Sequence, residues 1–164
     1  MHSFSQKYTL AHTISDLPDG YEYSMKDWPL HITLADVFAI DGDPGSLLKD
    51  IATRLRTYIP VRAEVVDDEW FGEDKSVHVR LLNKTPELQE LHETILRVLD
   101  GYYVVFNHPE YNGSGFRPHA TVQLKEQLAL KDVVTFGSIT LIDMYPDENP
   151  YRRRVIGTIH FIKR

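Results

Sequence analysis

The sequence has no cysteine, no long apolar run and no excess of positive charge, and each absence removes a class of function. Without cysteine among its 164 residues, the chain has no disulfide framework, no thiolate nucleophile and no cysteine-based zinc site. No apolar run approaches the roughly 18 residues of a membrane span, and the first residues lack the apolar segment of a signal peptide. We therefore expect a cytoplasmic protein with no membrane partner.

The charge of the chain is negative, with a formal net value of −6 at pH 7. Proteins that coat long nucleic acids make many phosphate contacts through a basic surface, so this charge argues against extended nucleic-acid coating. A small nucleotide or an RNA end remains a compatible partner. The basic run Arg152-Arg153-Arg154 fits either a local phosphate site or solubilising charges beside a turn.

The remaining composition is that of an ordinary globular protein, with 42% hydrophobic and 26% charged residues. A chain of this length can bury a hydrophobic core, and the sequence contains no low-complexity linker. We expect one bilobal domain spanning residues 1–164, acting as a monomer.

Two short segments share the pattern His-apolar-Thr-apolar: His31-Ile32-Thr33-Leu34 and His119-Ala120-Thr121-Val122. In a β-strand, the His and Thr of such a tetrad point to one face and the apolar residues to the other. Two such strands side by side would present two imidazoles and two hydroxyls to one ligand, which suits a phosphodiester. A third His-x-Thr begins at His92, but it lies in a segment with helical spacing, where positions two apart diverge by about 200°. We interpret that copy as structural.

The order of the expected elements indicates an α+β fold with antiparallel sheets. Apolar periodicity and turn signals predict strands over 6–14, 30–40, 61–66, 76–82, 116–124, 135–144 and 154–162, and helices over 43–59 and 85–101. Residues 107–115 have the composition of a loop. Each half of the chain carries one helix and one tetrad, which indicates internal pseudo-symmetry.

The two tetrads resemble those of the two-histidine (2H) phosphoesterase superfamily and, within it, the bacterial 2′-5′ RNA ligase-like proteins. Members carry two His-x-Thr-x motifs about half a chain apart, the second usually preceded by proline, as Pro118 precedes His119 here. Leu30 stands before the first histidine instead of proline. The resemblance covers nearly the whole chain. It implies two pseudo-symmetric lobes whose antiparallel sheets face a central cleft, helices on the outside, and no metal or other cofactor.

For such proteins the implied substrates are 2′,3′-cyclic phosphates, 2′-5′ linkages or related nucleotides. Opening a cyclic phosphate requires a base for water and an acid for the leaving oxygen, and histidine serves either role near neutral pH. His31 and His119 are the candidates for this pair, with Thr33 and Thr121 as donors to the phosphate oxygens. Which histidine is the base is not set by the sequence. Further candidates for substrate binding are Arg80, Tyr111, Phe116, Arg117 and Tyr151.

Several alternatives stay open at this point. The same four residues can run the reaction in reverse as 2′-5′ RNA ligation, or the chain can be a nucleotide- or RNA-end-binding module with little turnover. A third alternative is an α+β domain without a ligand, in which the two motifs lie far apart. A metal site is not expected, because Asp36 lies an odd number of residues from His31 and should face away from it.

Overall fold

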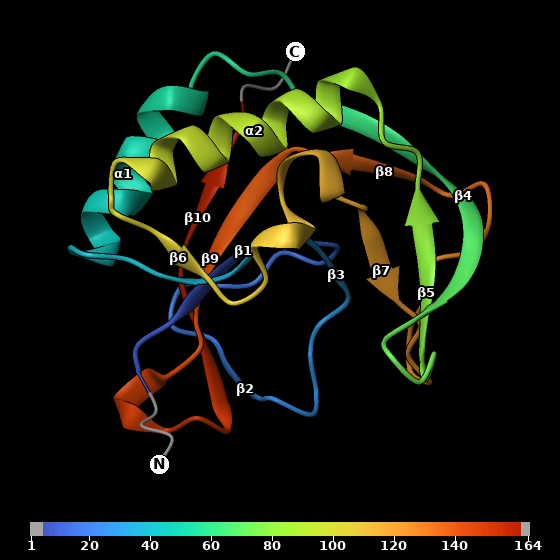
Figure 1. Cartoon of the computed structure of the whole chain (residues 1–164), viewed down its shortest axis with the longest axis horizontal. Coiled ribbons are helices and arrows are strands. Elements are labelled where there is room, and N and C mark those ends of the chain that lie inside the picture. The colour runs from blue at the N-terminus through green and yellow to red at the C-terminus, as the bar shows by residue number, and fades with distance from the viewer. Residues whose placement is uncertain (1–4, 162–164) are drawn as a thin grey trace.

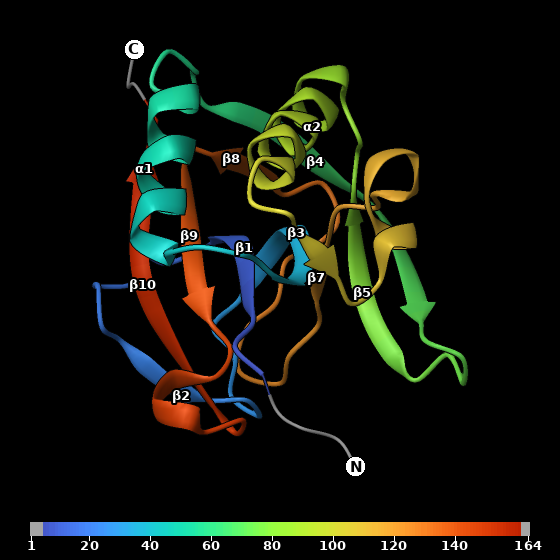
Figure 2. The same cartoon turned by 60° about the vertical axis from the view of Figure 1, so that its left-hand side comes forward.

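The computed structural model describes residues 5–161. Its strands form two antiparallel sheets, one of six strands in the order β2-β10-β9-β1-β3-β6 and one of four in the order β7-β5-β4-β8 (Figures 1 and 2). The elements are β1 Tyr8–Thr13, β2 Glu22–Ser24, β3 His31–Ala39, α1 Pro44–Leu55, β4 Val61–Phe71, β5 Val77–Leu82, α2 Pro86–Asp100, β6 Val105–Phe106, β7 His119–Thr121, β8 Val133–Phe136, β9 Ser138–Asp143 and β10 Arg152–His160. Short 3₁₀ turns cover Pro109–Tyr111, Gly113–Gly115 and Pro146–Glu148. The predicted α+β fold with two lobes is confirmed.

Both helices begin where the sequence signals place them. The Asp43 carboxylate accepts the Ser46 backbone N–H at 2.9 Å before α1, and the Thr85 hydroxyl oxygen accepts the Leu88 N–H at 3.1 Å before α2. Each cap satisfies one of the backbone donors that a helix N-terminus leaves unpaired. α1 packs against β10, and α2 packs against β3 and β4, so the helices cover one side of the six-stranded sheet (Figure 1).

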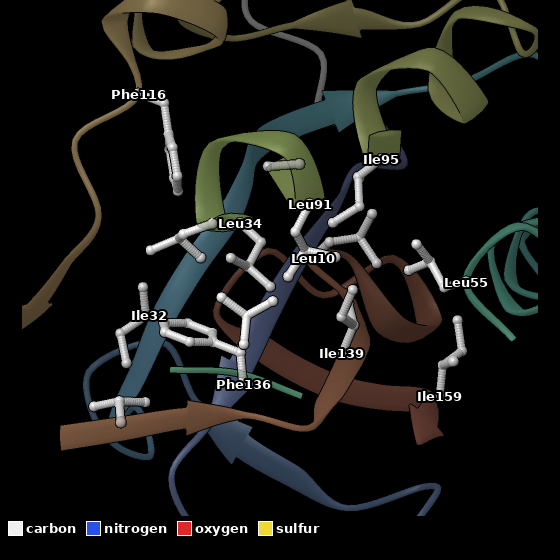
Figure 3. Close-up of a cluster of buried hydrophobic side chains, with 14 of the residues drawn as sticks. Leu10, Ile32, Leu34, Leu55, Leu91, Ile95, Phe116, Phe136, Ile139 and Ile159 are labelled. Carbon is white, nitrogen blue, oxygen red and sulfur yellow. The ribbon is translucent and has the colours of Figure 1, made fainter. Parts of the chain in front are cut away.

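The main core lies between that sheet and the helices (Figure 3). Ile32 and Leu34 of β3 are fully buried there, together with Leu91 and Ile95 of α2. Burying one such side chain contributes about 1.5–3 kcal/mol. Because the apolar residues of β3 are committed to this core, the alternate residues of the strand face away from the helices.

The course of the chain differs from the prediction where strands change sheets. The predicted strand over 135–144 is two strands: β8 pairs with β4 in the small sheet, and β9 pairs with β1 and β10 in the large one, with Gly137 between them. β4 extends to Phe71, five residues past the predicted end at 66, while β7 is confined to His119–Thr121. The short strands β2 and β6 lie outside every predicted strand. Within residues 5–161, no helix is both long and apolar enough to cross a membrane.

Candidate active site

The two tetrads lie on β3 and β7, neighbouring strands from different sheets (Figure 2). On β3, Ile32 is buried while His31 and Thr33 are partly exposed. On β7, Ala120 is 1% exposed, whereas His119 is partly exposed and Thr121 is exposed. Each strand therefore presents its histidine and threonine on one face and anchors itself with the residue between them.

Two pockets open around these four side chains. The first, which we call the aromatic pocket, has a volume of about 540 Å³ and includes Thr33 and His119. Its walls carry four aromatic rings, those of Trp70, Phe71, Tyr111 and Phe116. The second, the lysine pocket, has a volume of about 620 Å³ and includes His31 and Thr121. Its other lining residues are Lys26, Asp27, Trp28, Gln123, Leu124 and Lys125.

The two motifs are therefore crossed, since each histidine shares a pocket with the threonine of the other motif. The aromatic pocket takes residues 34–36, which follow Thr33 on β3, together with Phe116 and Arg117, which precede β7. The lysine pocket takes residues 26–28, which precede β3, and residues 123–125, which follow β7. β3 and β7 thus run in opposite directions across the site, and a ligand placed between the pockets meets both motifs.

The two imidazoles are held in the same way. Nδ1 of His31 donates to the carbonyl oxygen of Pro29 at 2.8 Å, and Nδ1 of His119 donates to the carbonyl oxygen of Arg117 at 2.7 Å. In the neutral ring this fixes the proton on Nδ1 and leaves Nε2 with a free lone pair. Both rings therefore expose the nitrogen that accepts or delivers a proton.

The environment favours the neutral form of each ring. Burial lowers the pKa of His31, and the nearby His119 lowers it further, against the opposing effect of the Pro29 carbonyl. Burial likewise lowers the pKa of His119, with a smaller contribution from the positive charge of Arg117. The coupling between the two rings means that protonation of one disfavours protonation of the other.

Aromatic neighbours fix the orientation of both rings. The indole of Trp28 lies 4.7 Å from the His31 ring between centroids, at an interplanar angle of 32°. The Phe71 ring contacts His119 edge-on, at 4.7 Å and 70°. The sequence reasoning missed both residues, although Trp28 lies just before the Pro29 that introduces the first tetrad.

Asp36 lies in the aromatic pocket with Thr33, so the prediction that it faces away from the site is wrong. Ala11 of β1 pairs with Thr33, but Leu10 pairs with Ala35, which makes Leu34 an extra residue in β3. This β-bulge shifts the alternation by one position, and Leu34 and Ala35 are both buried. The Asp36 carboxylate accepts the His108 backbone N–H at 2.6 Å, and burial raises the pKa of this carboxyl.

Three of the further candidate residues line the aromatic pocket: Tyr111, Phe116 and Arg117. The Phe116 ring is buried and stacks on His92 at a centroid distance of 4.0 Å. The Arg117 guanidinium lies over the Phe71 ring, 4.9 Å from its centroid, and pairs with the Glu69 carboxylate at 2.7 Å. Tyr111 is 56% exposed at the pocket rim.

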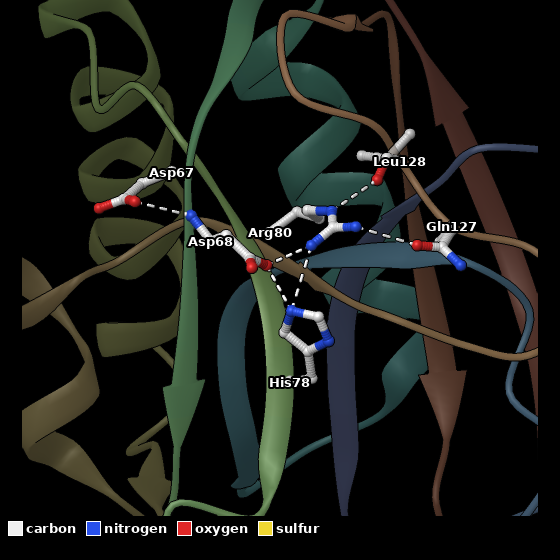
Figure 4. Close-up of polar contacts among 6 residues, drawn as sticks. All are labelled: Asp67, Asp68, His78, Arg80, Gln127 and Leu128. Atoms are coloured by element: carbon white, nitrogen blue, oxygen red, sulfur yellow. Dashed lines mark hydrogen bonds and ion pairs between the residues drawn. The ribbon is translucent and has the colours of Figure 1, made fainter.

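Arg80 and Tyr151 line neither pocket. Arg80 pairs across the sheet with Ala120, whereas Leu81 pairs with His119, so the Arg80 side chain lies on the opposite face of the small sheet from His119. There its guanidinium donates to Asp68, to Gln127 and to the Leu128 carbonyl (Figure 4). Arg80, a candidate for substrate binding, is therefore held in contacts away from both pockets. Tyr151 is exposed in the turn before β10.

The run at 152–154 has structural contacts. The buried Arg153 donates to the carbonyl oxygens of Met144, Pro150 and Arg152 and lies over the Trp28 ring. Arg154 pairs with Glu22 and Asp147.

Within residues 5–161, no group of three or more His, Cys, Asp or Glu side chains is placed to hold a metal ion.

The sequence matches the family model described as the 2′-5′ RNA ligase superfamily over residues 7–136. The chain belongs to this superfamily. No curated protein sequence shows significant similarity to it. Among solved structures, Escherichia coli LigT complexed with 3′-AMP aligns with a TM-score of 0.57 and 15% identity, covering 95% of this chain and 98% of that one. A crystal structure titled as a phosphoesterase aligns with a TM-score of 0.57, 14% identity and the same coverages.

The protein TT0787 of Thermus thermophilus aligns with a TM-score of 0.52 and 16% identity, covering 94% of this chain and 97% of that one. Further LigT structures hold NADP⁺, phosphate and ATP. At these identities the likeness establishes the fold shared with these proteins. Membership of the superfamily places the chain among phosphoesterases and RNA ligases.

Proposed function

We propose that this superfamily member is a metal-independent phosphodiesterase that hydrolyses a 2′,3′-cyclic phosphate or a related nucleotide phosphodiester. The observation that carries the proposal is the crossed arrangement of His31, Thr33, His119 and Thr121 around two adjoining pockets. All four residues come from one chain, so a monomer holds a complete site.

The chemistry divides between the two imidazoles. One Nε2 takes a proton from water as its oxygen bonds to phosphorus, and the other Nε2 donates a proton to the ribose oxygen as its bond to phosphorus breaks. In the free site burial favours two neutral rings. A bound phosphate brings a negative charge that favours protonation of one of them, which gives the required acid and base.

The threonine hydroxyls donate hydrogen bonds to the non-bridging oxygens on phosphorus, which do not react. Negative charge concentrates on these oxygens in the transition state, and a charge-assisted hydrogen bond contributes about 1.5–3 kcal/mol. Because each threonine lies across from the histidine of the other motif, the donors and the proton-transfer groups surround the phosphorus together. The aromatic pocket offers stacking surfaces for the base of the bound nucleotide.

Hydrolysis of a 2′,3′-cyclic nucleotide tests the proposal. His31→Ala and His119→Ala should each abolish most turnover, while His160→Ala, a change at an exposed histidine on β10, should leave it unchanged. The pH profile of kcat/KM should be bell-shaped, with its acidic limb below the ordinary histidine pKa of about 6.5 because both pKa values are lowered. EDTA should have no effect.

Three results would refute this function. They are turnover that survives either histidine substitution in a folded protein, a flat profile between about pH 5 and pH 9, and tight nucleotide binding with no turnover. The last result would favour a binding module.

A further inference from the structure

The aromatic pocket holds a carboxylate that no cation neutralises. Asp36 lines this pocket, and its side chain accepts hydrogen bonds from two backbone N–H groups, that of His108 at 2.6 Å and that of Val37. Within residues 5–161, no lysine, arginine or histidine side chain forms an ion pair with it. A carboxylate has about four acceptor sites, so Asp36 retains capacity for further N–H donors from a ligand in the pocket.

An amide donor without a partner lies beside this carboxylate. Asn112 lines the same pocket, and its Oδ1 accepts the Asp36 backbone N–H at 3.5 Å. In the described part of the chain, the Asn112 Nδ2 is buried and has no hydrogen-bond partner. A buried donor without an acceptor is unfavourable, and turning Nδ2 towards a ligand oxygen breaks no hydrogen bond of that atom. The pocket wall thus carries an acceptor and a donor side by side.

These two groups lie where the edge of a nucleobase would lie in the proposed complex. Asp36 is three residues beyond Thr33 on β3, a span of at most about 10 Å. That span is comparable with the distance from the phosphate of a nucleotide to the far edge of its base. The aromatic rings of the pocket offer faces for stacking, and a base stacked in this way is read by hydrogen bonds to its Watson–Crick edge.

The order of acceptor and donor discriminates among the four bases. Guanine presents two adjacent N–H donors, on N1 and N2, followed by the acceptor O6. Adenine has one donor group at this edge, and the lone pair of its N1 is repelled by a carboxylate. Cytosine and uracil also have one donor group each, with an acceptor next to it. Guanine therefore matches a carboxylate beside an amide N–H better than the other three bases do.

We propose that Asp36 and Asn112 select guanine as the base of the bound nucleotide. The Asp36 carboxylate accepts the N–H groups of N1 and N2, and the Asn112 amide donates to O6. This inference rests on the proposed function and adds the identity of the base to it. Neither residue takes part in the proton transfers of His31 and His119, so the selection acts mainly on KM.

The test compares 2′,3′-cyclic GMP with 2′,3′-cyclic IMP, which lacks only the N2 amino group. In the wild type, kcat/KM for the guanine compound should be greater by about tenfold or more, from one charge-assisted hydrogen bond. Asp36→Asn keeps an oxygen for the His108 N–H but removes the second carboxylate oxygen, and it should reduce the ratio to about one. The control Asp19→Asn removes the same charge at an exposed position outside both pockets and should keep the ratio.

The contribution of Asn112 is measured with a second pair of substrates. Hypoxanthine has O6, whereas adenine has an amino group in its place. Asn112→Ala should therefore lower the preference for 2′,3′-cyclic IMP over 2′,3′-cyclic AMP, by roughly 2- to 12-fold for one neutral hydrogen bond. An equal fall for all three cyclic nucleotides would exclude Asn112 from the selection.

Three results overturn the selection of guanine while hydrolysis itself persists. They are a wild-type ratio near one, a ratio that survives Asp36→Asn, and a preference for the adenine compound over the guanine compound. If none of the three compounds is hydrolysed, the proposed function fails, and calorimetric titration with 3′-GMP and 3′-IMP judges the selection separately. The wild type must then bind 3′-GMP about tenfold more tightly and Asp36→Asn must bind both equally, and any other result refutes the selection.

Discussion

Replacing His92 with glutamine should make the stability of the protein less sensitive to mild acid. His92 is fully buried on α2, where Nδ1 donates to the Leu34 carbonyl at 2.6 Å and Nε2 accepts the Gly113 backbone N–H at 2.9 Å. The ring thus links α2 by hydrogen bonds to the bulge of β3 and to the loop before β7. It also stacks on the Phe116 ring. Protonation of Nε2 removes the acceptor for Gly113.

The size of the effect follows from proton linkage. Burial lowers the pKa of His92 in the folded state, against the opposing effects of the Leu34 carbonyl and the Glu93 charge, while the unfolded chain has a pKa near 6.5. The unfolded state therefore binds more protons as the pH falls through 6.5, so His92 destabilises the fold in that range. If the folded-state ring stays neutral, lowering the pH from about 7.5 to about 5.5 reduces the free energy of unfolding by at most about 1.4 kcal/mol.

Urea unfolding at these two pH values measures the loss. The wild type should lose more unfolding free energy than His92→Gln, by up to about 1.4 kcal/mol, because glutamine has a donor and an acceptor but does not titrate. His160→Gln, a change at an exposed position, should behave like the wild type. An equal pH dependence in His92→Gln and the wild type would refute the reasoning, as would a stability of the wild type that rises on acidification.

Three further predictions concern the threonines, two glycines and Phe116. Thr33→Val and Thr121→Val should each lower kcat/KM for a cyclic nucleotide by roughly 10- to 150-fold, from a lost bond of about 1.5–3 kcal/mol, and an unchanged rate would remove the hydroxyls from the mechanism. Gly115→Ala should disrupt the loop and lower the melting temperature, because its Cβ would lie 1.9 Å from a backbone carbonyl oxygen, while Gly137→Ala, whose nearest contact is at 3.7 Å, should melt close to the wild type. Phe116→Ala should cost about 3–5 kcal/mol in unfolding free energy and raise KM, so a wild-type KM would exclude Phe116 from nucleotide binding.

The helices were predictable because their signals are local. Asp43 and Thr85 cap helices that begin at the next residue, and apolar spacing identifies the buried face of each. That His31 and Thr33 share one face of β3 was predictable for the same reason, because the apolar Ile32 between them points to the opposite face. His92 was also predictable as a structural residue, because it lies on a helix and is buried in the fold.

Properties that depend on distant pairing were not predictable. The residues on both sides of Gly137 are rich in β-forming types, and their partners divide them between sheets, since Val134 pairs with Ala63 and Leu141 with Leu10. Strand β2 has only three residues, and it forms against β10 by pairing over a separation of more than 120 residues. The backbone carbonyls that accept hydrogen bonds from His31 and His119 could not be predicted from the motif either. A histidine on a strand has no defined hydrogen-bond partner until the path of the preceding residues is known.

The bulge in β3 explains why alternation succeeded at Thr33 and failed at Asp36. Alternation assigns faces only while each residue pairs with one partner, and the extra Leu34 breaks that condition one position after the motif. The same shift places a carboxylate beside Thr33 and His119, where an ideal strand would have buried it in the core. Since Asp36 accepts the backbone N–H of His108, the bulge also attaches the loop before β7 to β3. The β-bulge that made the prediction for Asp36 wrong therefore helps to form the aromatic pocket from both halves of the chain.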